Sequence, residues 1–315
     1  MQGFLWITFW IALSVKPTPL RQIMGQSIAV SPDGRTLWTS DTRSNSIYIY
    51  DANTGEEKGA VSRGLGAGIG PLLAINNHRV AVQALKEKKN RFYLVEDTQV
   101  KIIPFSLPKG QTLAAFPFIY LAQGSTLVSL LHTGLLTDAL AWDFSHDPPL
   151  ESPRIGISSR CTGLWGEATQ VHLICNDGIH HVAIEPTGNL TQQGAVDERF
   201  SGLEWALVRG DNARFAWVKN SILSILEFGA NKSKDAKTLH FNETLVPKDI
   251  AFVPGTSVIA LTFQTDDEIW MWDYTTTTQL AKIKVIGPTF AATSEVPRVI
   301  WFRTKRGVLR VEAKL

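Results

Sequence analysis

Seven short apolar segments, each ending in an acidic residue, recur along this chain at nearly equal spacing. The acidic residues are Asp51, Glu96, Asp143, Glu185, Glu227, Asp273 and Glu312. The six intervals between them are 45, 47, 42, 42, 46 and 39 residues, with a mean of 43.5. A unit of this length with several strands cannot bury its apolar faces alone and has to stack against its neighbours. The period therefore predicts an all-β fold, a seven-bladed β-propeller.

Each unit repeats the same order of strands and turns. In the first unit we expect strands at Ser27–Ser31, Thr36–Ser40 and Ser46–Asp51, with a fourth at Glu57–Val61. The dipeptide Asp33-Gly34 separates the first two strands, and glycine readily adopts the positive φ that tight hairpin turns require. The blades are therefore predicted to be four-stranded and antiparallel. Two stacked β-sandwiches are the alternative for so strand-rich a chain.

The seventh unit has only three strands before the sequence ends at Leu315. An unpaired edge strand is a liability, and a ring needs its two ends joined. We expect Leu20–Met24 to lie beside Gly307–Ala313 and to close the ring. Residues 16–315 are then a single propeller domain.

The first fifteen residues differ from the rest of the chain. Phe4–Val15 is an uncharged apolar run of 12 residues, shorter than the roughly 20 residues that span a membrane. Ala12-Leu13-Ser14 has the small-x-small pattern of a cleavage site, so residues 1–15 are predicted to be a signal peptide. No Lys or Arg precedes the run, and a buried first strand or a membrane anchor are the alternatives. The net charge of +2 favours neither nucleic acid nor a membrane surface as a partner.

The chain has two cysteines, Cys161 and Cys175, in the first two predicted strands of the fourth unit. The midpoint between them falls in the turn at Gly166–Thr169, so they face each other in a simple hairpin. Side chains at such positions have Cβ atoms about 4.5–5.5 Å apart, close enough for a disulfide with small adjustments. Two buried free thiols are the alternative. A disulfide indicates an oxidising compartment, the periplasm or the cell exterior.

Motifs for self-sufficient catalysis, metal binding or cofactor binding do not occur in the sequence. Gly64–Gly70 lacks the G-x-G-x-x-G spacing and a following helix, so it is interpreted as a flexible connection. His180 and His181 are neighbours in a strand and point to opposite faces, so they cannot share a metal. Asp266-Asp267 is interpreted as a turn. The remaining histidines are expected in loops or on strand surfaces; they are His78, His132, His146, His172 and His240.

Four segments resemble the heavy subunit of methylamine and aromatic amine dehydrogenases. Asp51–Val61 is similar to the first strand pair of that family, and Lys89–Gly110 is similar to its basic loop and Leu-Pro exit. Asp197–Glu227 follows its D-E-x-[FL] start. The most specific match is Cys161–Gly178 (CTGLWGEATQVHLICNDG), a cysteine pair followed by a polar-Asp-Gly turn. Generic propeller repeats share the S-P-D-G and D-x-x-T-G pieces, so the cysteine segment and the order of the units distinguish this family. The resemblance covers roughly residues 45–230.

This resemblance implies a periplasmic heavy subunit without catalytic residues, metal or cofactor of its own. It would join a small subunit in a two-plus-two complex. The small subunit carries tryptophan tryptophylquinone, deaminates primary amines oxidatively and passes electrons to a blue copper protein or a cytochrome. In the connection Arg63–Gly70, Leu65 or Ile69 would face the small subunit. A stand-alone exported propeller that serves as a binding scaffold, or a metal-dependent propeller lactonase, are the alternatives.

Overall fold

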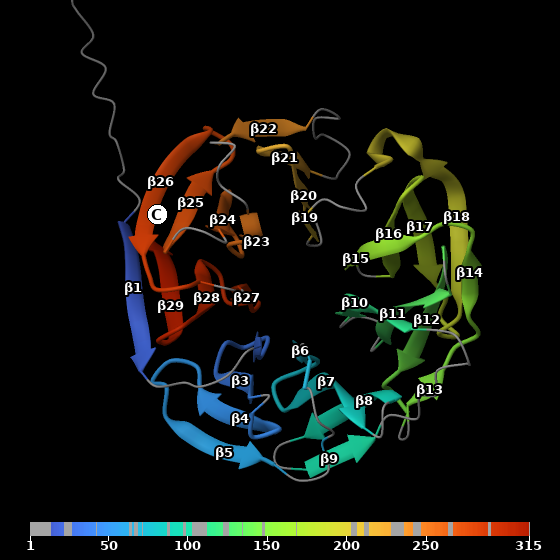
Figure 1. Cartoon of the computed structure of the whole chain (residues 1–315), viewed down its shortest axis with the longest axis horizontal. Coiled ribbons are helices and arrows are strands. Elements are labelled where there is room, and N and C mark those ends of the chain that lie inside the picture. The colour runs from blue at the N-terminus through green and yellow to red at the C-terminus, as the bar shows by residue number, and fades with distance from the viewer. Residues whose placement is uncertain are drawn as a thin grey trace, which may run out of the picture.

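Seven antiparallel sheets stand around a common axis and form a closed ring in the computed structural model (Figure 1). The predicted seven-bladed propeller is therefore confirmed. The residues that the structure describes are 14–21, 27–41, 43–62, 65, 69–70, 72–86, 89–96, 99–102, 112–121, 126–133, 135–146, 149–167, 169–202, 207–210, 214–227, 236–241, 247–263, 267–288 and 291–314.

The strands of each blade follow one another from the axis to the rim. Blades 1 and 2 comprise β2 (Ser27–Val30), β3 (Thr36–Asp41), β4 (Ser46–Asp51), β5 (Glu57–Val61), β6 (Leu72–Ala74), β7 (Arg79–Lys86), β8 (Lys89–Glu96) and β9 (Gln99–Ile102). Blades 3 and 4 comprise β10 (Thr112–Leu121), β11 (Thr126–Thr133), β12 (Leu136–Asp143), β13 (Leu150–Glu151), β14 (Ile155–Ile157), β15 (Cys161–Glu167), β16 (Gln170–Cys175), β17 (Gly178–Ile184) and β18 (Leu190–Asp197).

The remaining three blades complete the ring. Blades 5 and 6 comprise β19 (Leu207–Gly210), β20 (Arg214–Lys219), β21 (Ile222–Glu227), β22 (Lys237–His240), β23 (Pro247–Phe252), β24 (Val258–Phe263), β25 (Glu268–Asp273) and β26 (Thr278–Lys284). Blade 7 comprises β27 (Ala291–Thr293), β28 (Val299–Thr304), β29 (Gly307–Lys314) and β1 (Ser14–Arg21). Blade 3 departs from the predicted four strands because β13 and β14 both pair with β12.

The core consists of apolar layers between neighbouring blades, and β24 shows how a single strand serves two layers. All six of its residues are buried. Ile259, Leu261 and Phe263 pack in a cluster with blade 5, whereas Val258 and Ala260 pack in a cluster with blade 7. Successive side chains of a strand point to opposite faces. A central strand between two neighbouring blades therefore reads as a continuous apolar run.

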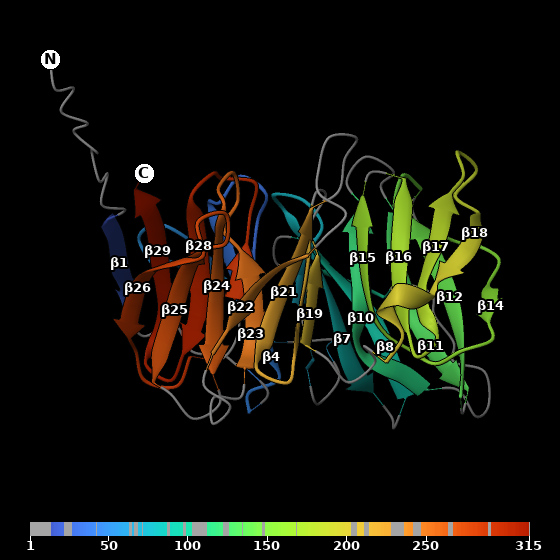
Figure 2. The ribbon, with the colours of Figure 1, turned by 90° about the horizontal axis from the view of Figure 1, so that it is seen from above.

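The N-terminal strand β1 closes the ring. It lies beside β29 (Figure 2) and pairs antiparallel with it along its whole length. Leu20 is opposite Val308 in this pairing. The closing strand begins and ends earlier than the predicted Leu20–Met24, because the pairing starts at Ser14 opposite Lys314 and stops at Arg21 opposite Gly307. Closure by the N-terminal segment is confirmed, and this register corrects the predicted boundaries; residues 22–24 lie outside the described part.

The predicted signal peptide lies mostly outside the described residues. Its last two positions, 14 and 15, belong to β1, and the assignment of residues 1–15 stays a prediction. Among the described residues, no helix has the length and apolarity to cross a membrane.

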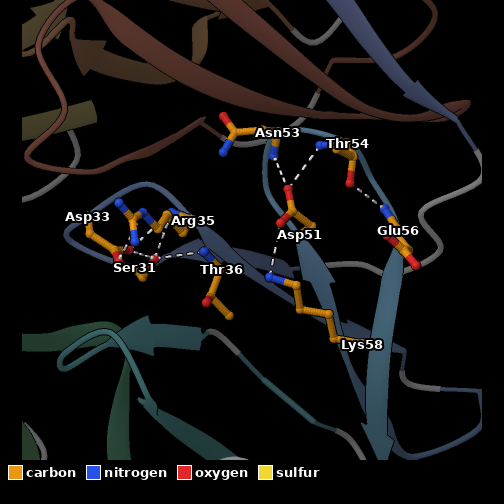
Figure 3. Close-up of polar contacts among 9 residues, drawn as sticks. All are labelled: Ser31, Asp33, Arg35, Thr36, Asp51, Asn53, Thr54, Glu56 and Lys58. Atoms are coloured by element: carbon orange, nitrogen blue, oxygen red, sulfur yellow. Dashed lines mark hydrogen bonds and ion pairs between the residues drawn. The ribbon is translucent and has the colours of Figure 1, made fainter.

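Hydrogen bonds within the turns explain the repeated acidic residue in blade 1 (Figure 3). The carboxylate of Asp51 accepts the backbone N–H groups of Asn53 and Thr54 at 2.9 and 3.0 Å, and Lys58 Nζ lies 3.0 Å from it. Partial burial alone would raise the pKa of Asp51, but these partners outweigh it and lower the pKa to about 2. The carboxylate is therefore charged at neutral pH and holds the turn that leads from β4 to β5.

The other acidic residues of the repeat are also engaged within the fold. Asp143 and Asp273 accept backbone N–H groups two residues further along, as Asp51 does. Two of the glutamates at this position reach another strand: Glu96 pairs with Arg79 at 2.8 Å, and Glu227 accepts the hydroxyl of Tyr274 at 2.7 Å. Glu312 instead pairs with Arg310 of its own strand at 3.2 Å. Aspartate at the end of a strand therefore shapes its own turn, whereas Glu96 and Glu227 join neighbouring strands or blades.

Substitution of the closing strand tests its contribution to stability. Leu20 is 2% exposed and packs with Trp301 and Val308, so we expect Leu20→Ala to lower the free energy of unfolding by about 2–4 kcal/mol. Urea denaturation followed by tryptophan fluorescence measures it. The control Leu135→Ala removes the same atoms from a side chain that is 74% exposed and should change stability by less than about 0.5 kcal/mol. Equal effects of the two substitutions would contradict closure by β1.

Candidate functional site in blade 4

Blade 4 and the adjoining β11–β12 hairpin of blade 3 hold both cysteines and four of the seven histidines. The first two strands of blade 4, β15 and β16, are joined by a disulfide between Cys161 and Cys175. These residues are direct cross-strand partners, which confirms the predicted disulfide and rules out the alternative of two free thiols. Both are fully buried and pack with Val128 and Leu130 of blade 3. The disulfide therefore lies inside the layer between two blades.

Two side chains of blade 3 hold the backbone of Cys161 from opposite sides. Thr137 Oγ1 accepts the N–H of Cys161 at 2.9 Å, and His132 Nε2 lies 2.6 Å from its carbonyl oxygen, to which it donates. His132 and Thr137 are themselves cross-strand partners in the β11–β12 hairpin. The expectation of a surface or loop position for His132 is wrong: it is 9% exposed, because it serves the contact between blades.

Beside the disulfide, the buried His180 stands at the centre of a polar cluster. Its Nε2 lies 2.9 Å from Asp177 Oδ1 and 3.2 Å from Ser159 Oγ, while its Nδ1 lies 3.2 Å from the amide nitrogen of Gln192. Partial burial would raise the pKa of Asp177, but hydrogen bonds from Ser159 and His180 hold it below its usual value. Asp177 and Ser159 come from the turn and the connection that flank β16 and β15 at one end of the blade.

The combination of serine, histidine and aspartate does not form a hydrolytic triad. In such a triad the serine and the aspartate bind opposite nitrogens of the imidazole, so that a proton can pass between them. Here Ser159 and Asp177 both approach Nε2, and Nδ1 faces Gln192. The Ser159 hydroxyl donates to Asp177. The cluster is therefore arranged to fix its own members rather than to activate a nucleophile.

With the disulfide formed, the candidate metal site of blade 4 lacks a ligand. Among the described residues, the one group of three potential ligands within 4.8 Å of one another is Cys175, Asp177 and His180. Cys175 is bonded to Cys161, and it is the thiolate that ligates metals. The remaining two donors are fewer than the three protein ligands typical of a catalytic zinc site.

Two histidines lie on the face of the β16–β17 hairpin opposite to His180. His172 and His181 are cross-strand partners, and their Nδ1 atoms are 2.7 Å apart, so one ring donates to the other. Burial, and to a smaller extent the neighbouring His181, lower the pKa of His172 to about 4. The expectation of a surface or loop position for His172 is wrong, because its ring is stacked beneath Trp165 at 4.6 Å.

The prediction that His180 and His181 point to opposite faces is confirmed, since they belong to separate clusters. The pairing of His181 with His172 was missed, although a signal for it exists. Cys175 pairs with Gly178 across the turn, and His172 and His181 each lie three residues further from it. The turn alone therefore specifies that these two histidines are opposite each other.

Aromatic rings continue from His172 into blade 5. Trp165 stacks on Phe215 with ring centroids 4.4 Å apart, and Phe215 stacks on Trp217 at 5.2 Å. Gly210 makes room for this stack, because a Cβ at that position would lie 2.3 Å from Trp165 Cγ. Blade 4 is thus joined to blade 5 by stacked rings and to blade 3 by the contacts of Cys161.

The structure also locates the other residues that the sequence singled out. Ile69 is 3% exposed in the cluster between blades 1 and 2, and the partly buried Leu65 packs on the same cluster. Their assignment to a subunit interface stays a prediction. Asp267 accepts the N–H of Gly287 at 2.8 Å, as a turn residue would; Asp266 lies outside the described residues. Exposed histidines, as expected, are His78, His146 and His240.

Comparison with known proteins establishes the class of fold. No family model matches the chain, and no curated protein is significantly similar to it in sequence. Among solved structures, it is similar to the crystal structure of the β-propeller domain of Cps50 (Swd1) from Myceliophteria thermophila, with a TM-score of 0.65. The match covers 96% of this chain and 100% of that domain at 11% identity. The chain is therefore a β-propeller, and a likeness at this identity supports the fold alone.

The buried histidine pair predicts a specific dependence of stability on pH. The folded state lowers the pKa of His172 from 6.5 to about 4, so between these values the unfolded chain binds more protons and stability falls as the pH falls. We expect this group to remove about 2–3 kcal/mol of unfolding free energy between pH 7 and 4.5. Urea denaturation across this pH range should show a smaller loss of unfolding free energy for His172→Gln than for the wild type. His240→Gln, at an exposed histidine of β22, is the control and should follow the wild-type curve; a loss in His172→Gln as large as in the wild type would contradict the assignment.

Proposed function

We propose that this chain is the heavy subunit of a periplasmic quinoprotein amine dehydrogenase. The observation that carries the proposal is the Cys161–Cys175 disulfide in blade 4. Cys161–Gly178 is the segment in which the resemblance to that family is most specific, and its cysteines are paired across β15 and β16. The closed seven-bladed ring supports the same proposal.

In this role the chain supplies a rigid surface, and the oxidation takes place on another polypeptide. The small subunit would carry tryptophan tryptophylquinone, oxidise primary amines and pass electrons to a blue copper protein or a cytochrome. The polar contacts of blade 4 support a scaffold role, because Asp177 and His180 bond to each other within blade 4 and His132 of blade 3 bonds to the backbone of Cys161. A metal-dependent lactonase finds no support in a ligand group whose thiol is part of a disulfide.

The face of the ring on which the innermost strands begin is the better candidate for docking; we call it the entry face. The connection with Leu65 and Ile69 leads into β6 on this face. The β11–β12 turn opens on it too, because the start of β10 pairs with His132 next to that turn. Leu135 and Leu136 of this turn are 74% and 51% exposed. Adjacent exposed leucines provide the apolar contact that a permanent subunit interface needs.

Co-purification tests the proposed function. The tagged chain, produced in its native host on an amine as nitrogen source, should retain a small cysteine-rich polypeptide with quinone absorbance, and the complex should reduce a redox dye when a primary amine is added. If the chain emerges alone, sediments as a stable monomer and shows no amine-dependent dye reduction, the proposal is wrong and a stand-alone scaffold replaces it.

Substitutions on the two faces of blade 3 test the docking surface. We expect Leu135→Asp with Leu136→Asp to weaken small-subunit retention by about tenfold or more, because charges would be buried in an apolar contact. Leu150→Asp is the matched control: Leu150 is 55% exposed but lies opposite Asp143, at the other end of the strands. It should change retention by less than about twofold. Circular dichroism checks the fold of each variant, and the reverse pattern would place docking on the opposite face.

A further inference from the structure

We propose that blade 4 contains a zinc-type metal site that the Cys161–Cys175 disulfide keeps locked. The ligands are Cys175, Asp177 and His180, and reduction of the disulfide makes the site available. This inference rests on the geometry of blade 4 and is independent of the proposed function.

The three donor atoms are already grouped before any metal binds. They lie within 4.8 Å of one another, and His180 Nε2 is 2.9 Å from Asp177 Oδ1. In a tetrahedral zinc site with bonds of about 2.0–2.3 Å, ligand atoms are about 3.3–3.8 Å apart. Shifts on the order of 1 Å would therefore complete the site, and a side chain freed from the disulfide gains such freedom. Thiolate, imidazole and carboxylate are the ligands that Zn²⁺ takes in proteins.

The surroundings of His180 resemble the support that a metal ligand requires. A ligating histidine normally donates its second ring nitrogen to a fixed partner, which sets the orientation of the ring. His180 Nδ1 lies 3.2 Å from the amide of Gln192, and a half-turn of that amide places an accepting oxygen there. His180 itself is 3% exposed, so its ring is held by packing, while the side chain of Asp177 is 41% exposed and gives an ion a route of entry.

The disulfide controls metal binding because Cys175 cannot form a thiolate while it is bonded to Cys161. A dithiol reductant supplies two electrons and two protons, which break the S–S bond and leave thiols at Cys161 and Cys175 while the reductant becomes a disulfide. Zn²⁺ then displaces the proton of the Cys175 thiol and binds the thiolate. Exchange with a small-molecule disulfide, which takes up two electrons and two protons and becomes two thiols, re-forms the Cys161–Cys175 bond and releases the ion. The same chain would thus bind the metal only under reducing conditions.

A pair of cysteine variants separates this site from nonspecific binding. Cys161→Ser and Cys175→Ser both lose the disulfide, but only Cys161→Ser keeps the thiol that belongs to the ligand group. With a phosphine reductant present to keep the thiol free, we expect Cys161→Ser to bind one Zn²⁺ per chain in equilibrium dialysis, at least about 100-fold more tightly than Cys175→Ser or the oxidised wild type. Co²⁺ in its place should give a thiolate charge-transfer band in Cys161→Ser alone.

A second histidine–aspartate pair provides the control. His146 Nδ1 lies 3.1 Å from Asp143 Oδ2 with the same three-residue spacing, and no cysteine is near it in the sequence. In the Cys161→Ser background, His180→Ala should weaken Zn²⁺ binding by at least about tenfold, and His146→Ala should leave it unchanged. Equal binding by the two cysteine variants, or equal effects of the two histidine substitutions, would overturn the proposal.

A measurement on the wild-type chain covers the case in which a cysteine variant does not fold. The wild type is reduced with the phosphine, and alkylation of each thiol by iodoacetamide is followed by mass spectrometry with and without Zn²⁺. We expect Zn²⁺ to slow the alkylation of Cys175 by about tenfold or more and that of Cys161 much less. Equal rates with and without Zn²⁺ would overturn the proposal.

Discussion

The whole ring depends on the burial of both faces of every blade against its neighbours. Strand β24 makes the constraint visible, because its alternate side chains belong to two different apolar layers. A blade at an open end would expose one such layer to water, at roughly 25 cal/mol for each Å² of apolar surface. The pairing of β1 with β29 removes that open end, and Leu20 of β1 completes the layer between blades 7 and 1.

Blade 4 is where this architecture departs from simple repetition. Its inner strand is joined to blade 3 by the hydrogen bonds that His132 and Thr137 make to Cys161, and to blade 5 by the stack of Trp165 on Phe215. The disulfide lies between these contacts. A blade held in this way can carry polar groups such as His180 and Asp177 at its end without losing its position. A rigid surface for a partner chain and a latent metal site are both consistent with that design.

Much of the fold was predictable because each repeat in the sequence corresponds to one blade. Seven acid-terminated strands predicted seven blades, and the turn midpoint predicted that Cys161 faces Cys175. The closing strand was placed several residues too late, since pairing of an edge strand depends on the full length of β29 rather than on local pattern. The extra outer strand of blade 3 was missed for a similar reason: β13 and β14 share one partner, β12, and neither shows a period of its own.

The contacts of blade 4 are of two kinds: pairings within a hairpin, and contacts between residues of different blades. Hairpin register follows from the turn, so the sequence contained the pairing of His172 with His181 as well as that of the cysteines. The contact of His132 with Cys161 joins residues in different blades, and the same holds for Gly210 beneath Trp165. No spacing in the chain encodes such contacts, because they arise only when the blades stack and their side chains compete for one layer. The number of blades and the register of their hairpins followed from the sequence; the closing strand and the polar groups that meet between blades were decided by packing.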